Sequence, residues 1–165
     1  MRGWLFDMMN DTHRQALDAL TAAIGDETDA QRAMETTVRL LARHLPDYTW
    51  TGIYLLDGNE LHLGPFVGKP SPHTRIPLGR GICGAAATEK ATIIVDDVNA
   101  DPRYLACSIE TRSEIVVPIM LDGDVLGELD IDSDRTAAFG ASDREMLERV
   151  AALLAPKLAR TRQAS

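Results

Sequence analysis

The chain has 165 residues, a length that suits one domain with a single hydrophobic core. Its 45% hydrophobic and 25% charged residues are typical of a globular protein. A formal net charge of −8, without any block of Lys or Arg, argues against nucleic acid as a partner. No run of about 18 apolar residues is present, so we also expect no membrane span.

The first nine residues include an apolar patch that Asn10 and Asp11 soon interrupt. This patch is too short for the core of a secretory signal, so we expect a cytoplasmic protein, in which thiols are normally kept reduced. The two cysteines of the chain are Cys83 and Cys107. They are either small core residues or a redox pair, whose disulfide would be transient and catalytic rather than structural.

The first predicted elements are two helices. Apolar residues recur at helical spacing over residues 11–24, where Gly25 closes the pattern. They recur again over residues 29–45, where Pro46 stops the helix. The hydrophobic period then changes, and strands are expected to follow.

A β-hairpin is predicted next, because residues 48–56 and 60–66 are rich in β-formers and flank turn residues at 57–59. Residues 68–81 contain three prolines and three glycines and are expected to form an ordered surface loop. The small residues at 84–87 predict a short helix packed closely on the sheet.

Another short strand is predicted over residues 91–95, followed by a loop with room for a helical turn over residues 96–107. Residues 113–121 and 124–132 predict a second hairpin. These elements, with a helix at each end of the chain, define an α+β fold: one antiparallel sheet with helices packed against it.

The final predicted element is a helix with Ser142 as its N-cap. Glu145 follows three residues later, as in a capping box. Pro156 is expected to bend or end this helix.

The last predicted strand has acidic residues on one face. Strict alternation puts one set of residues on one face, namely Val125, Gly127, Leu129 and Ile131. It puts the other set on the opposite face, namely Leu126, Glu128, Asp130 and Asp132. This second face is either simply solvated, or it binds an amino group or supplies protons. In a confined site, repulsion would raise the pKa of at least one of its carboxyl groups.

The position of Glu114 depends on the turn of the second hairpin. A two-residue turn at Asp122-Gly123 would place Glu114 opposite Ile131, on the face without the acids. A three-residue turn with a glycine bulge would place it opposite Asp130. Because a slip of one residue moves every side chain to the other face, both registers stay open.

Six strings occur together in an order that closely resembles the GAF-domain free methionine-(R)-sulfoxide reductases. These strings are residues 50–54, 63–69, 79–84, 106–107, 113–118 and 129–133. The resemblance covers roughly residues 28–155. It implies a single GAF domain over residues 28–160, after an N-terminal helical segment at 1–27 and before a tail at 161–165. In that fold, the terminal helices pack on one side of the sheet, and loops and short helices enclose a pocket on the other.

The resemblance implies separate roles for the two thiols. Cys107 matches the nucleophile, which attacks the sulfoxide sulfur, releases methionine and becomes a sulfenic acid. Cys83 matches a resolving position and would form a disulfide with Cys107, which thioredoxin then reduces. The resemblance also implies that the protein is a homodimer with no bound cofactor and no metal.

The remaining site residues are also implied by the resemblance. Glu114, Asp130 and Asp132 match acids that hold the substrate, and one of them would protonate the departing oxygen. Trp50 and Tyr54 match an aromatic wall around the methyl sulfoxide group. Their spacing of four residues on a strand puts both on one face, which is consistent with one pocket.

One feature departs from the family. The family usually has a third cysteine in the loop after the Gly-Lys pair, and here residues 69–75 contain none. Turnover would therefore depend on Cys83 alone or on an outside thiol. Locally, Cys83 lies near the start of a predicted helix, where N–H dipoles favour a thiolate, and Cys107 lies near Arg103 and Arg112 in sequence.

Two alternatives to a working reductase are considered. One is a non-catalytic GAF module that binds a small ligand as a sensor. Such modules usually accompany an output domain, and none is recognisable in this sequence. The other is a reductase that has lost turnover but keeps its pocket.

Overall fold

The computed structural model describes residues 8–105 and 109–163. Its helices are α1 (Asp11–Ile24), α2 (Ala30–His44), α3 (Gly81–Glu89) and α4 (Ala141–Gln163), with a 3-10 turn at Val98–Ala100. Its strands are β1 (Trp50–Asp57), β2 (Glu60–Val67), β3 (Arg75–Pro77), β4 (Ile93–Val95), β5 (Ser113–Leu121) and β6 (Asp124–Ser133). They form one antiparallel sheet in the order β3-β2-β1-β6-β5-β4. The predicted α+β fold is confirmed.

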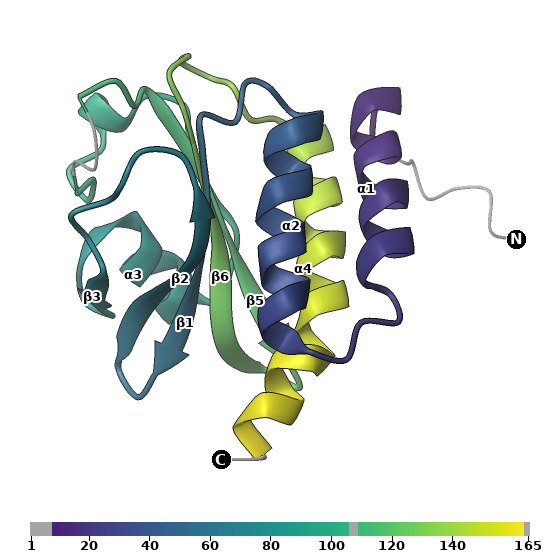
Figure 1. Ribbon diagram of the computed structural model, residues 1–165. Helices are drawn as coiled ribbons and strands as arrows, with labels where there is room; N and C mark the ends of the chain where they lie inside the picture. Colours follow the sequence, from purple (N-terminus) through teal and green to yellow (C-terminus); the bar gives the residue numbers. More distant parts are fainter. Residues whose placement is uncertain (1–7, 106–108, 164–165) are drawn as a thin grey trace, which may run out of the picture.

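Helices cover one face of the sheet in two layers (Figure 1). α2 and α4 pack on the strands, and α1 packs on α2 and α4 from outside. α2 begins at the N-cap Asp29, whose side chain accepts a hydrogen bond from the Arg32 backbone N–H at 2.8 Å. Its buried stripe includes Met34, Val38 and Leu41, as the helical spacing predicts.

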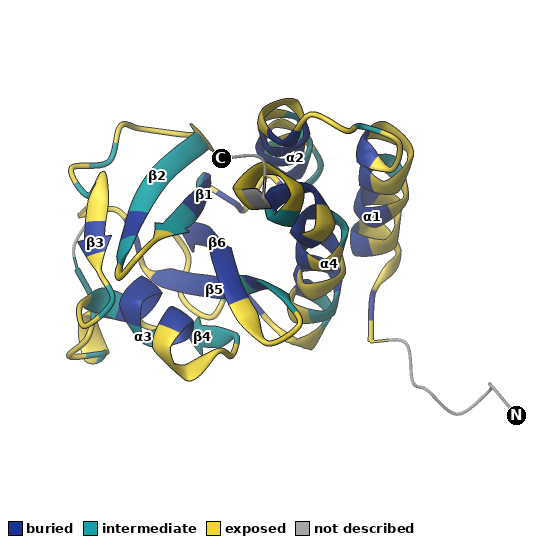
Figure 2. Ribbon diagram, turned by 90° about the horizontal axis from the view of Figure 1, so that it is seen from below, coloured by how far each residue is buried: buried dark blue, intermediate teal, exposed yellow. Residues whose placement is uncertain are grey.

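The other face of the sheet is covered by α3, by β3 and by loops (Figures 1 and 2). A second, smaller core fills this space and includes Tyr54, Ile82, Cys83 and Val116. β3 was not expected, because residues 68–81 are rich in proline and glycine. It forms because Ile76 pairs with Leu61 of β2 and is buried.

A β-bulge sets the register of the second hairpin. The turn at residues 122–123 has positive φ at both positions, 53° and 84°, as a type I′ turn requires. Beyond it, Ile119 pairs with Gly127, and Leu126 is an extra residue without a partner in the ladder. Leu126 therefore lies in the helix-side core and Val125 in the smaller core, the reverse of the faces that strict alternation predicts.

The bulge also decides the position of Glu114. This residue pairs with Asp132, so neither predicted partner, Ile131 or Asp130, is correct. The turn has two residues, as in the first predicted register. The bulge then shifts the partner of Glu114 by one residue from Ile131 to Asp132, whereas a three-residue turn would have shifted it to Asp130. Glu114 consequently lies on the same face as the acids of β6.

The start of α4 also differs from the prediction. The helix begins at Ala141, so Ser142 lies inside it and is not the N-cap. The carboxylate of Asp143 accepts a hydrogen bond from the Gly140 backbone N–H at 2.9 Å and satisfies the helix start in place of Glu145.

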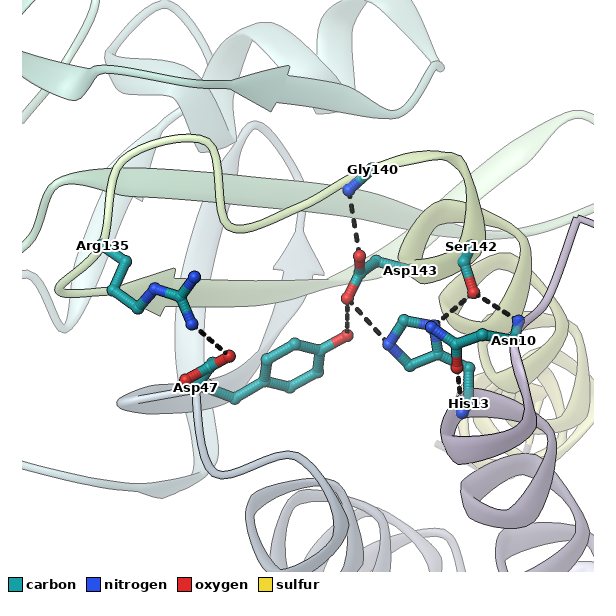
Figure 3. Close-up of polar contacts among 8 residues, drawn as sticks. Asn10, His13, Asp47, Arg135, Gly140, Ser142 and Asp143 are labelled. Atoms are coloured by element: carbon teal, nitrogen blue, oxygen red, sulfur yellow. Dashed lines mark hydrogen bonds and ion pairs between the residues drawn. The ribbon is translucent and has the colours of Figure 1, made fainter.

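His13 joins α1 to this helix start, as Figure 3 shows. Its Nε2 atom lies 3.1 Å from Oδ1 of Asp143, and its Nδ1 atom contacts the Ser142 hydroxyl. The same Asp143 oxygen accepts a hydrogen bond from the Tyr48 hydroxyl at 2.7 Å. The Ser142 oxygen also accepts one from the Asn10 backbone N–H at 2.9 Å. This network fixes the first turn of α1 to the start of α4, in addition to the packing of α1 on α2 and α4.

α4 continues past Pro156 to Gln163, so Pro156 does not end it. A proline removes one backbone hydrogen bond, and the packing of the helix on the sheet compensates for that loss. Among the described residues, no helix is both long and apolar enough to cross a membrane.

Candidate functional site

Three rungs across the central strands bring the predicted site residues together. The first rung joins Trp50 of β1, Asp132 of β6 and Glu114 of β5. The second joins Gly52, Asp130 and Val116, and the third joins Tyr54, Glu128 and Pro118. Because paired residues point to the same face, the acids and the aromatic residues share one side of the sheet, toward α3.

The four acids are buried rather than solvated. Glu114 is 5% exposed, Glu128 0%, and Asp130 and Asp132 are each 2% exposed. The interpretation of this strand face as a solvated surface is therefore wrong. Burial of so many carboxyl groups costs considerable free energy, which indicates a functional rather than a structural reason for them.

Cys83 lies over these acids in the first turn of α3 and is 5% exposed. Its Sγ atom and carboxylate oxygens of Glu114 and Asp130 all lie within 4.8 Å of one another. Gly84 lets α3 pack against the segment that follows β3, because a Cβ at this position would lie 2.6 Å from the carbonyl oxygen of Leu78. Cys107, the predicted nucleophile, lies outside the described residues.

Burial raises the pKa values of the Cys83 thiol and of three of the acids. Burial raises the pKa of Cys83 well above its usual value, and the charges of Asp130, Glu128 and Glu114 add to this. The expected thiolate-favouring effect of the helix start is therefore outweighed. Burial raises the pKa of Asp130, although hydrogen bonds with Glu114 and Cys83 oppose it. Burial and the charge of Asp130 raise the pKa values of Glu128 and Asp132 well above the usual range.

Trp50 and Tyr54 lie on one face of β1, as their spacing predicts. The rings of Trp50 and Tyr54 lie 6.5 Å apart, and Trp50 stacks on Phe66 at 5.7 Å. The indole folds over Gly52, where a Cβ would lie only 2.3 Å from a ring carbon of Trp50. Gly52 is therefore needed for this ring position.

The loop between β2 and β3 is fixed to this wall by hydrogen bonds. The Trp50 indole N–H donates to the carbonyl oxygen of Lys69 at 2.9 Å, and the Tyr54 hydroxyl donates to that of His73 at 2.7 Å. The Lys69 ammonium group forms an ion pair with Glu110 at 2.8 Å, which joins the loop to the segment before β5.

Two cavities open along the rungs. The outer one has a volume of about 210 Å³, and its lining includes Trp50, Lys69 and Asp132. The inner one is a narrow space of about 20 Å³, and its lining includes Cys83 and Asp130. The site thus combines an outer chamber beside an indole with an acidic inner end beside a thiol.

Strand alternation places Glu128 on the acidic face of the last strand, but the resemblance assigns it no role. The structure buries it beside Asp130 and the Cys83 thiol. Phe66 was missed, because a hairpin partner strand alone does not indicate which ring stacks on Trp50.

Comparison with known proteins agrees with this geometry. Residues 15–158 match the GAF domain family, to which the chain therefore belongs. The free methionine-R-sulfoxide reductase of Escherichia coli (strain K12) is 37% identical over 140 residues, which cover 85% of this chain and 84% of the relative. Within the GAF domain family, the chain belongs with the free methionine-R-sulfoxide reductases.

Solved structures support the same assignment. The free methionine-R-sulfoxide reductase from Neisseria meningitidis, in complex with its substrate, is 37% identical with a TM-score of 0.87 and covers 100% of both chains. The fRMsr of Staphylococcus aureus, also in complex with its substrate, is 37% identical with a TM-score of 0.83. That match covers 91% of this chain and 98% of the other.

Proposed function

We propose that this protein reduces free methionine-(R)-sulfoxide to methionine. The observation that supports this most directly is the row of buried acids next to an aromatic wall and a cysteine. A free amino acid has an ammonium group, which the acids attract, and its methyl sulfoxide group is soft and polarizable, which suits contact with aromatic rings. The relatives described above are named for this activity, which supports the proposal.

The proposed binding mode follows the two ends of the site. Glu114, Asp130 and Asp132 hold the polar groups of the substrate, while the methyl sulfoxide end contacts Trp50 and Tyr54. The ammonium group adds a positive charge to a cluster in which burial raises the pKa values of Asp130 and Asp132. Substrate binding therefore favours ionisation of one acid while another stays protonated and can donate a proton.

The proposed reaction has two covalent steps. The Cys107 sulfur attacks the sulfoxide sulfur and takes over its oxygen, which releases methionine and leaves a sulfenic acid on Cys107. The Cys83 thiol then attacks this sulfur, so that a disulfide forms and the hydroxyl leaves as water with the thiol proton. A dithiol reductant restores both thiols. Thioredoxin is our proposal for this reductant.

A coupled assay tests the activity. NADPH oxidation through thioredoxin reductase and thioredoxin is followed with free methionine-(R)-sulfoxide, and the (S)-epimer and a peptide-bound sulfoxide serve as control substrates. We expect turnover with the free (R)-epimer and its loss in Cys107→Ser. Binding without turnover in the wild type would contradict the proposal and favour the sensor alternative.

The reductant and the assembly need separate measurements. Turnover with dithiothreitol but not with thioredoxin would contradict only the choice of reductant. We also propose a cytoplasmic homodimer, on the basis of the family resemblance. Size-exclusion chromatography with light scattering tests this, and a mass of one chain, about 18.0 kDa, would contradict it.

A further inference from the structure

The inner end of the site gathers more ionisable groups than the ammonium group of one amino acid substrate can pair with. Cys83, Glu114 and Asp130 line the inner cavity, Glu128 is buried on the same strand face, and no Lys or Arg side chain is among the described residues that line this cavity. An ammonium group brings one positive charge. A divalent cation brings two and can bind several anionic ligands at once.

Three ligand atoms are already close enough for one ion. The Cys83 sulfur and single oxygens of Glu114 and Asp130 lie within 4.8 Å of one another. In a tetrahedral zinc site, bonds of about 2.0–2.3 Å place neighbouring ligands about 3.6 Å apart. The three atoms therefore need to approach by at most about 1.2 Å, which small torsional adjustments of the side chains provide.

Unsatisfied oxygens at the same place point to a missing ligand. Neither carboxylate oxygen of Glu128 has a hydrogen-bond partner of normal geometry among the described residues, and neither does Oδ1 of Asp130. Both side chains are almost completely buried. Glu128 lies on the same strand face as Asp130. It is close to the Cys83 thiol, which lowers the pKa of Glu128, while the charge of Glu128 raises the pKa of the thiol. Buried oxygens without partners are rare in native proteins and suit a cation.

We infer that Cys83, Glu114 and Asp130 bind one thiophilic divalent cation of the Zn²⁺ class, with Glu128 as a fourth or supporting ligand. A thiolate among carboxylates favours Zn²⁺ or Cd²⁺ over Mg²⁺ and Ca²⁺, which bind oxygen ligands. The ion occupies the positions proposed for the substrate's polar groups and blocks the Cys83 sulfur. Metal binding itself does not depend on reductase activity.

A Cd²⁺ titration of the reduced protein, without substrate, tests this site. We expect an ultraviolet thiolate-to-metal charge-transfer band that saturates at one ion per chain. Cys83→Ser removes the band, and Asp130→Asn weakens binding by about 10-fold or more. Cys107→Ser keeps the band. The matched control is Asp122→Asn, in the exposed turn after β5, which leaves the titration unchanged.

The outcomes separate the metal site from the proposed reaction. A band that is absent in the wild type, persists in Cys83→Ser, or is lost in Cys107→Ser overturns the inference. Circular dichroism checks that each variant folds. Should Cys83→Ser not fold, the isosteric Asp130→Asn decides: unchanged affinity overturns the site, and weakened affinity supports it. An active reductase without the band would disprove only the metal site.

Discussion

Glu114 and Asp132 face each other across the β5–β6 ladder, and both are buried. Like charges directly opposite each other on neighbouring strands destabilise a sheet. The fold therefore holds a cost at this pair, which is reduced when one carboxyl group is protonated or when a cation lies between them. Such a pair of facing carboxyl groups favours the binding of a cationic group, because the cation reduces their repulsion.

The first prediction concerns stability and pH. Burial and the charge of Asp130 raise the pKa of Asp132 well above its usual 3.8, although a hydrogen bond with Glu114 opposes them. Between that value and the raised one, the folded state binds more protons than the unfolded state, so stability falls as pH rises. Asp132→Asn removes this loss. We expect the variant to be more stable than the wild type at pH 7 and the difference to disappear near pH 4.

Thermal unfolding across this pH range measures the effect, at about 2–4 °C in Tm per kcal/mol for a chain of this size. The exposed Asp134 provides the control, since Asp134→Asn is expected to stay within about 0.5 kcal/mol of the wild type. An Asp132→Asn variant that is less stable at neutral pH would disprove the proposed cost.

The second prediction concerns Cys83. Without a third cysteine, Cys83→Ser cannot resolve the sulfenic acid within the chain. We expect one methionine per chain in a rapid burst, followed by slow turnover at the rate of reduction by an outside thiol. Rapid-quench measurement of methionine, with a sulfenic-acid probe, detects both phases. Steady turnover at the wild-type rate would contradict the resolving role.

The third prediction concerns Trp50. An aromatic contact with sulfur contributes about 0.3–1.5 kcal/mol, so Trp50→Ala should raise KM by about 2–10-fold. Gly52→Ala should act in the same direction, because its Cβ would displace the indole. Phe139→Leu, in the helix-side core, is the matched aromatic control. For that control, thermal unfolding should show lower stability, whereas steady-state kinetics should show an unchanged KM.

The fourth prediction concerns the network in Figure 3. Burial raises the pKa of Asp143, but hydrogen bonds from His13, Gly140 and Tyr48 outweigh it and lower the pKa below 3.8. The stabilising contribution is therefore present above that value and is lost as pH falls through the lowered pKa. Asp143→Asn should lower the free energy of unfolding by about 1–3 kcal/mol at pH 7, and by less near pH 3.

Chemical denaturation at both pH values tests this. Asp47→Asn serves as the control, because Asp47 pairs with Arg135 at the surface, where an ion pair contributes about 0–1 kcal/mol. Equal losses in the two variants would indicate that the buried network has no special role.

Much of the fold could be predicted because hydrophobic spacing directly reflects helix and strand periods. The buried stripe of α2 at Met34, Val38 and Leu41 is an example, because the spacing of these residues within one helix is enough to put them on the same face. The start of α4 was predicted less well. Serine is a residue type that N-cap positions favour, but the Ser142 hydroxyl contacts His13 of α1, a tertiary partner that local sequence does not indicate.

The candidate site depended on a register that alternation cannot provide. A bulge has no simple sequence signature, so the faces of Val125 and Leu126 and the partner of Glu114 were open to error. Alternation placed Glu128 on the acidic face but could not show that it lies near the thiol of α3, because that helix is distant in sequence.

The bulge at Leu126 also determines where this hairpin tolerates changes in length. Within the exposed turn at residues 122–123, an added or deleted residue alters only the tip, while the pairing from Ile119 and Gly127 onward is preserved. On the other side of the bulge, the same change would turn the acids toward the helices and the aliphatic residues toward the cavity. Homologous chains should therefore differ in hairpin length at the tip and keep a constant spacing from Gly127 to Asp132.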